Sequence, residues 1–80
     1  MMTREIVDKM LFEREQAGFG RPAKILAGKT AFMDLAKTCL IVVADSDEGG
    51  KIASWHPTFD GIEVDLDNKL GANDLEFVNQ

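Results

Sequence analysis

The segment of residues 62–67 constrains the fold most, because its side chains alternate strictly between apolar and acidic. It reads Ile62-Glu63-Val64-Asp65-Leu66-Asp67. Successive side chains of a β-strand point to opposite faces of a sheet, so the apolar residues share one face and the three carboxylates share the other. The pattern predicts a half-buried strand. The preceding pair Asp60-Gly61 is typical of a turn.

A helix is predicted over residues 4–17. Thr3 is a suitable N-cap, and Glu5 would lie in the first turn, where the helix dipole favours a negative charge. The apolar residues recur at helical spacing and form one face, made of Ile6, Val7, Met10, Leu11 and Ala17. Glycines at 18 and 20, followed by Pro22, end the helix.

The segment between Pro22 and Val43 is harder to assign. Residues 23–27 are apolar but too few for a secure helix, so they could form a strand. A second helix is predicted from Thr30, which would cap it, with an apolar stripe of Phe32, Leu35 and Ala36. Residues 39–44 are apolar and rich in β-branched side chains, which predicts a buried strand. The alternative is that the second helix continues through Val43.

The second half of the chain is predicted to consist mainly of strands. Residues 45–50 have the composition of a turn, and residues 51–55 can return as a strand to complete a hairpin. The pair His56-Pro57 is predicted to break that strand. A loop is expected over 68–73 and a last short strand over 75–78.

These elements predict one α+β domain spanning residues 1–80. It would contain an N-terminal amphipathic helix, a second short helix and a small, mainly antiparallel sheet of three to four strands. The length is ordinary for one domain. The composition, 45% hydrophobic and 29% charged, is typical of a folded protein rather than a disordered one.

Cysteine and histidine usage excludes several classes of site. Cys39 is the only cysteine, so no internal disulfide can form, and His56 is the only histidine. Structural zinc sites need about four such ligands, so we expect no metal centre. No apolar stretch approaches the roughly 18 residues that span a bilayer, and the start of the sequence lacks the apolar run of a signal peptide. We therefore expect a cytoplasmic protein.

Two glycine motifs only partly resemble nucleotide-binding loops. Gly28-Lys29-Thr30 matches the end of a phosphate-binding loop, but the position that needs the first glycine is Ala23. The run from Gly18 to Gly20 follows a helix rather than a strand, so we interpret it as a turn. We expect no cofactor.

Two further constellations are equally incomplete. The acidic residues near 45 would need a bidentate glutamate eleven residues after Asp45 to form a calcium loop of the EF-hand type, and His56 stands there instead. Cys39 and His56 could be imagined as a nucleophile and its base. Cys39, however, lies in an apolar run, where a thiol is usually inert. We predict that the chain is not an enzyme.

Charge is distributed unevenly along the sequence. Residues 1–40 carry seven Lys and Arg against five Asp and Glu, whereas residues 41–80 carry two against nine. The net charges of the two halves are therefore +2 and −7, which give −5 in total. The second half should repel nucleic acid and could contact a basic protein surface, including the basic half of a second copy.

The candidate partner-binding residues lie in this acidic half. The acidic ones are Asp60, Glu63, Asp65 and Asp67, which form either the solvated face of a sheet or an electrostatic docking face. The aromatic ones are Trp55 and Phe59. These two either cover the core or anchor an interface, as Trp and Phe often do.

Several short motifs resemble a pattern in small tailed-phage and prophage proteins and in the C-terminal part of tailed-phage major capsid proteins. The resemblance covers about residues 22–78. The matching pieces are Pro22-Ala23-Lys24-Ile25, Phe32 with Leu35, Phe59-Asp60-Gly61-Ile62-Glu63-Val64, Leu70, and Leu75-Glu76-Phe77-Val78. It implies a phage-encoded accessory or minor virion component with no active site to transfer.

We therefore expect a non-enzymatic phage or prophage protein that acts in virion assembly through protein–protein contacts. The partner would be a second copy or a basic host or phage protein, with no direct contact to nucleic acid or membrane. Copies could pair head to tail through their oppositely charged halves, so neutralising Glu63, Asp65 and Asp67 together should weaken assembly. The alternative is a small acidic inhibitor, of the anti-defence type, of a basic host protein that handles nucleic acid.

Overall fold

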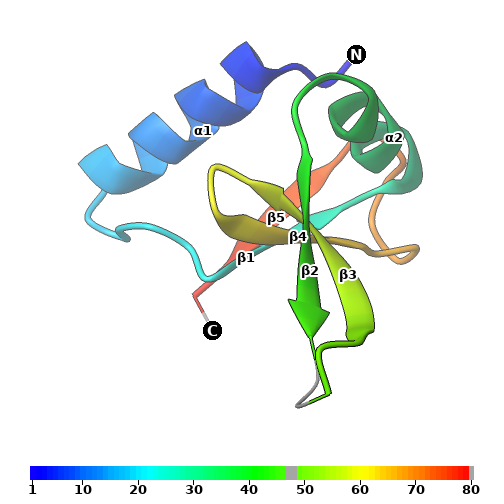
Figure 1. Cartoon of the computed structure of the whole chain (residues 1–80). Helices are drawn as coiled ribbons and strands as arrows, with labels where there is room; N and C mark the ends of the chain where they lie inside the picture. The colour runs from blue at the N-terminus through cyan, green and yellow to red at the C-terminus, as the bar shows by residue number, and fades with distance from the viewer. Residues whose placement is uncertain (47–48, 80) are drawn as a thin grey trace.

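The fold consists of two helices packed on one face of a mixed sheet (Figure 1). The computed structural model describes residues 1–46 and 49–79, and within them the sheet has five strands in the order β2-β3-β4-β1-β5. The elements are α1 (Arg4–Gln16), β1 (Lys24–Ala27), α2 (Lys29–Thr38), β2 (Ile41–Ser46), β3 (Ile52–Phe59), β4 (Ile62–Leu66) and β5 (Leu75–Val78). The predicted α+β class is confirmed. The predicted sheet of three to four mainly antiparallel strands is too small.

The additional strand is β1, the segment whose assignment was open between helix and strand. It lies between β4, to which it is parallel, and β5, to which it is antiparallel. Ile25 and Ala27 are fully buried, while Lys24 and Leu26 are half-buried on the other face. A parallel neighbour requires a long crossover, here the whole stretch from α2 to β3, and no local sequence pattern indicates such a pairing.

The helix α1 forms where the sequence predicts it, but only Val7 of its predicted apolar face is fully buried, and Ile6 and Ala17 are exposed. Thr3 is the N-cap, and its hydroxyl accepts a hydrogen bond from the backbone N–H of Ile6 at 3.3 Å. The helix ends one residue earlier than predicted, and Gly18 adopts a φ of +90° after it. The guanidinium of Arg14 lies 5.4 Å from the ring centroid of Phe19 and 5.8 Å from that of Phe77. The contact between Arg14 and Phe77 packs the end of α1 against β5.

The helix α2 begins earlier than predicted. Its N-cap is Gly28 rather than Thr30, and no side chain caps it. The first turn is instead held by the loop before β5, because the backbone N–H of Gly28 donates to Asp74 and that of Ala31 donates to Ala72, each at 2.9 Å. The helix ends at Thr38, so the alternative of a helix running through Val43 is wrong.

The predicted turn at Asp60-Gly61 joins β3 to β4. Asp60 has a φ of +48° and Gly61 a φ of +85°, and Phe59 pairs directly with Ile62 across the turn. Two consecutive positive φ angles are the geometry of a type I′ turn, whose twist suits a two-residue hairpin. Asp-Gly is among the sequences that adopt it with least strain. The turn therefore fixes the register of β3 against β4.

The predicted break at His56-Pro57 is wrong, because β3 runs continuously through both residues. Pro57 lacks a backbone N–H and is tolerated only where no ladder bond is lost. It lies one residue beyond Thr58, where the pairing of β3 with β4 stops. Pro57 therefore has no paired residue in β4, and its missing N–H removes no hydrogen bond between β3 and β4.

The predicted strand at 39–44 exists, but it is shifted to Ile41–Ser46 and it is not buried. Ile41, Val42, Val43 and Ala44 are all exposed. The reason is topological: β2 is the edge strand, and it pairs with the part of β3 that extends beyond β4. Of the predicted turn at 45–50, residues 47 and 48 lie outside the described part of the chain.

The hydrophobic core lies between the two helices and the central strands. It comprises Val7 of α1, Ala31 and Leu35 of α2, and Ile25, Ala27, Phe59, Ile62 and Val64 of the sheet. The alternation predicted for β4 is confirmed for Ile62 and Val64, whereas Leu66 at the end of the strand is half exposed. No helix among the described residues is long and apolar enough to cross a membrane.

The two aromatic residues of β3 should differ sharply in their contribution to stability. Phe59 is fully buried and Trp55 is 62% exposed, although both lie on one strand. We expect Phe59→Ala to lower the free energy of unfolding by about 3–5 kcal/mol, because it leaves a cavity. Trp55→Ala, the matched control, should change it by roughly 0.5 kcal/mol. Urea unfolding of both variants would measure this, and equal losses would contradict the burial of Phe59.

Candidate functional site

The six candidate partner-binding residues lie near one another along β3 and β4 but not on one surface. Phe59 is buried in the core, so it cannot anchor an interface, and its inclusion among the contact residues is wrong. Trp55 is exposed on the free part of β3. Asp60 lies in the β3–β4 turn, and the other three acidic residues follow it, Glu63 and Asp65 in β4 and Asp67 just after it.

Asp60 is held by α1. The guanidinium of Arg4 donates to both of its carboxylate oxygens, at 3.0 and 2.9 Å, and lies 4.8 Å above the ring of Phe59. Arg21 donates to the Asp60 backbone carbonyl. The hydrogen bond from Arg4 and the positive charges of both arginines lower the pKa of Asp60, although partial desolvation opposes them. Asp60 therefore fastens the turn to the first helix.

The carboxylates of β4 also have partners within the chain. Asp65 forms an ion pair with Lys24 of β1 at 2.8 Å, which raises the pKa of Lys24 above its ordinary value. Glu63 lies 3.6 Å from Nδ1 of His56. Asp67 accepts a hydrogen bond at 2.8 Å from the backbone N–H of Lys69. A basic partner would have to compete with these contacts, so the acidic stripe is not an unoccupied docking face.

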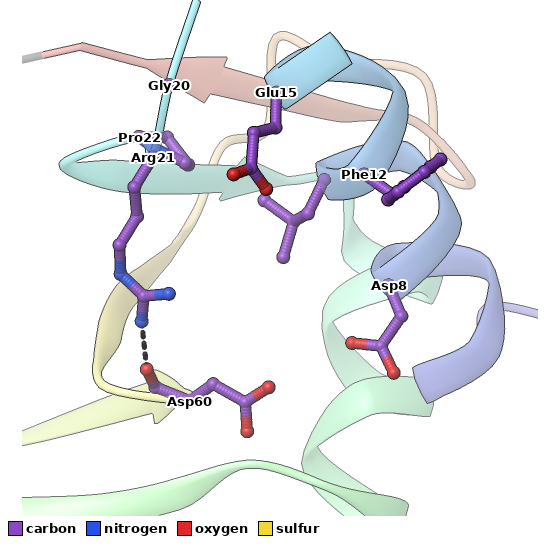
Figure 2. Close-up of a pocket in the computed structure, with 8 residues that line it drawn as sticks. Asp8, Phe12, Glu15, Gly20, Arg21, Pro22 and Asp60 are labelled. Carbon is purple, nitrogen blue, oxygen red and sulfur yellow. Dashed lines mark hydrogen bonds between the residues drawn. The ribbon is translucent and has the colours of Figure 1, made fainter.

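One pocket lies between α1, the α1–β1 connection and the β3–β4 turn (Figure 2). Its volume is about 420 Å³, and the residues that line it are Asp8, Leu11, Phe12, Glu15, Gly20, Arg21, Pro22 and Asp60. Figure 2 shows Asp8, Glu15 and Arg21 on different sides of the pocket, with Arg21 reaching toward Asp60. No polar or charged residue is buried in the described part of the chain, so the pocket holds no sequestered acid or base.

The residues of the incomplete motifs have structural roles. Gly28 packs so closely against the carbonyl oxygens of Gly71 and Ala72 that a side chain there would overlap them, which explains the glycine without a phosphate. Cys39 is half-buried beside the core, and the Nε2 of His56 is 2.9 Å from the hydroxyl of Ser54. Among the described residues, no three Cys, His, Asp or Glu side chains gather as a metal site would require.

Several large apolar side chains are exposed on the β2–β3 hairpin, which extends away from both helices (Figure 1). Ile41 is 67% exposed, Val42 54% and Val43 48%, in addition to the exposed Trp55 on the neighbouring strand. Residues that pair directly share a face, so Val42 and Trp55 lie on the helix side of the hairpin, whereas Ile41, Val43 and His56 lie on the open side. Apolar side chains thus cover both faces of one exposed element.

The sequence prediction missed this surface because it placed residues 39–44 in the core. An apolar, β-branched run does not reveal whether its strand is central or at an edge. Pro57 was the available signal, because a proline inside a strand indicates a site where one neighbouring strand is missing. No protein-family model, curated protein or solved structure matches this chain, so its candidate site is defined by its own geometry.

The ion pair between Arg4 and Asp60 predicts a pH dependence of stability. Because folding lowers the pKa of Asp60, its contribution is present above the ordinary aspartate pKa of about 3.9 and is lost as the pH falls through the lower folded value. Asp60→Asn should therefore destabilise the protein at pH 7 more than at pH 3. Urea unfolding at both pH values measures this.

A double-mutant cycle assigns that effect to Arg4. Asp60→Asn should cost less in an Arg4→Met background than in the wild type, because the pair is already broken. Lys24→Met is the matched control, since Lys24 pairs with Asp65 instead. Its effect should add to that of Asp60→Asn. Equal coupling in the two cycles would show that the Arg4 contact is not the cause.

Proposed function

We propose that this chain is a non-enzymatic binding protein that works through protein–protein contacts made by its β2–β3 hairpin. The observation that carries the proposal is the exposure of Ile41, Val42, Val43 and Trp55 on one projecting element. Exposed apolar side chains on both faces of one element are unfavourable in water and indicate a contact site. Trp is also the residue type most often found to dominate interface energies.

The setting we propose is virion assembly, as a structural or accessory protein, in the host cytoplasm or the particle itself. This setting depends on the resemblance of residues 22–78 to tailed-phage proteins, and the exposed hairpin supports the binding role within it. A protein that joins an assembly presents a surface whose apolar side chains become buried only in the assembled state. The hairpin provides such a surface without disturbing the core.

The alternative function, an acidic inhibitor of a basic host protein, is less well supported by the geometry. Docking through the acidic residues would require a partner to replace Arg4 at Asp60 and Lys24 at Asp65. Docking through the hairpin breaks no contact of this kind. We therefore place the contact on the apolar hairpin.

Salt dependence separates the two contacts. Salt weakens the attraction between exposed charges, because the screening length is about 8 Å at physiological ionic strength and shorter at higher salt. Contacts of apolar side chains persist, and the net charge of −5 even favours closer approach of two copies at higher salt. Complexes that survive or tighten at high salt would support the hairpin.

Substitutions test the same point directly. Trp55→Ala should weaken the complex that the purified protein forms by about 30-fold, since a hot-spot truncation costs about 2 kcal/mol. Phe19→Ala is the matched control, because Phe19 is a similarly exposed aromatic at 64% but lies in the α1–β1 connection. Isothermal titration with the partner, or dilution of the self-associated protein, gives the affinities.

A second variant identifies the competing function. Neutralising Glu63, Asp65 and Asp67 as amides should leave the affinity nearly unchanged. If this variant loses binding and Trp55→Ala retains it, the acidic face is the contact and the proposal is wrong. Trp55 is the only tryptophan, and the chain has no tyrosine, so a shift of its fluorescence to shorter wavelength reports directly on burial of the hairpin.

A further inference from the structure

We propose that the hairpin binds a second copy of this chain, with the two β2 strands paired edge to edge and antiparallel across a two-fold axis at Val43. The inference rests on the proposed function and names the partner and the geometry of the contact. The two sheets would join into one continuous sheet. The contact is isologous, so each copy contributes the same strand and the assembly closes as a dimer.

The free edge of β2 exposes backbone hydrogen-bonding groups that a second strand could pair with. Within the part of the chain that the structure describes, β2 is at the end of the strand order, so one side of it faces no strand. The hydroxyl of Thr58 in β3 donates to the carbonyl of Ile41 at 2.8 Å, which shows that this carbonyl faces β3. Because backbone groups alternate along an antiparallel strand, the N–H and C=O groups of Val42 and Ala44 point away from β3, toward the free edge of the sheet. They are the groups that another strand would bind.

Symmetry restricts the register. A two-fold axis perpendicular to the sheet keeps each face on its own side, and residues directly opposite in a ladder share a face. One residue of β2 must therefore lie opposite itself. With Val43 on the axis, Val42 of each copy lies opposite Ala44 of the other. The backbone groups of both residues, which point toward the free edge, are then hydrogen-bonded. The ladder then uses the regular part of the strand.

The neighbouring registers are less suitable. An axis at Val42 leaves only residues 41–43 paired within β2. An axis at Ala44 draws in Ser46, where the pairing of β2 with β3 is irregular. The Val43 register avoids both problems. It also places the β-branched side chains of Val43 from the two copies in direct contact, a favourable cross-strand pair.

Charge supports an antiparallel arrangement. In this register the end of β2 that carries the aspartate at position 45 lies alongside the α2–β2 connection of the second copy. Lys37 is exposed in the last turn of α2, beside that connection. The register thus brings the strand end with an aspartate at sequence position 45 toward the helix end with a lysine at position 37 in each half of the dimer. The attraction offsets part of the repulsion between two chains of net charge −5.

The other edge of the sheet is less suited to the same role. β5 has four residues against six in β2. Its apolar residues Leu75 and Phe77 already pack against the core, and Asn79 beyond it is hydrogen-bonded to Arg14. Short edge strands with occupied side chains are poor templates for pairing.

A single introduced cysteine tests the register. In a Cys39→Ala background, Val43→Cys should form a disulfide-linked dimer under mild oxidation. A directly opposed pair without mutual hydrogen bonds has a Cα separation of about 4.5 Å, which a disulfide can bridge. Ile41→Cys is the matched control. It lies on the same face and is more exposed, 67% against 48%, but faces residue 45 rather than itself.

We expect Val43→Cys to cross-link at least ten times faster than Ile41→Cys, measured by non-reducing electrophoresis at several protein concentrations. Random collisions would favour the more exposed Ile41 position. Equal rates, faster linking at Ile41 or no dimer at Val43 would overturn the proposal. Unchanged circular dichroism of both variants confirms that they are folded.

Val42→Pro provides an independent measurement. It removes an outward-facing N–H and leaves the groups that face β3 in place, which an edge strand tolerates. Light scattering should show a monomer for this variant and a dimer for the wild type. A wild-type monomer at every concentration would overturn the inference alone. Loss of partner binding by Trp55→Ala would still support the proposed function in that case.

Discussion

The parallel pairing of β1 with β4 is the interaction on which the rest of the fold depends. It places Ile25 beside Val64 on the helix side, where α1 and α2 cover them, and brings Lys24 within reach of Asp65 on the other side. β5 then adds to the free edge of β1. Because β1 is flanked on both sides, Ile25 and Ala27 are fully buried, and Leu26 on the other face is half-buried. The core of this small protein is consequently concentrated at one end of the sheet.

The projecting hairpin follows from that concentration. β3 has eight residues and β4 has five, and the tight turn at Asp60-Gly61 fixes their pairing at the end of β3. β4 then diverges to pair with β1, so most of β3 keeps only β2 as a neighbour. Neither α1 nor α2 extends along the projecting part of the hairpin (Figure 1). An apolar strand outside the core is therefore a consequence of topology rather than of local sequence.

This division explains which features the sequence could predict. Local rules identified α1 from its cap and periodicity, the Asp60-Gly61 turn from its dipeptide, and Ile62 and Val64 as core residues from alternation. The rest depended on pairing between distant segments. The parallel partner of β1 lies almost forty positions away in register, at Glu63 for Lys24. The edge position of β2 follows only once that pairing is known, so its exposure could not be predicted from its composition.

The same reasoning explains why the acidic stripe was a weaker candidate than its composition indicated. A strand that alternates carboxylates with apolar residues must present the carboxylates opposite the core, whatever its function. In this fold Lys24 on the neighbouring strand forms an ion pair with Asp65, and His56 lies 3.6 Å from Glu63, so both carboxylates already have a contact within the chain. The apolar side chains Ile41, Val42 and Val43 of β2 are, by contrast, only partly covered by the described residues. About half or more of each of these side chains is exposed to solvent, and burial of that apolar surface would favour the proposed association.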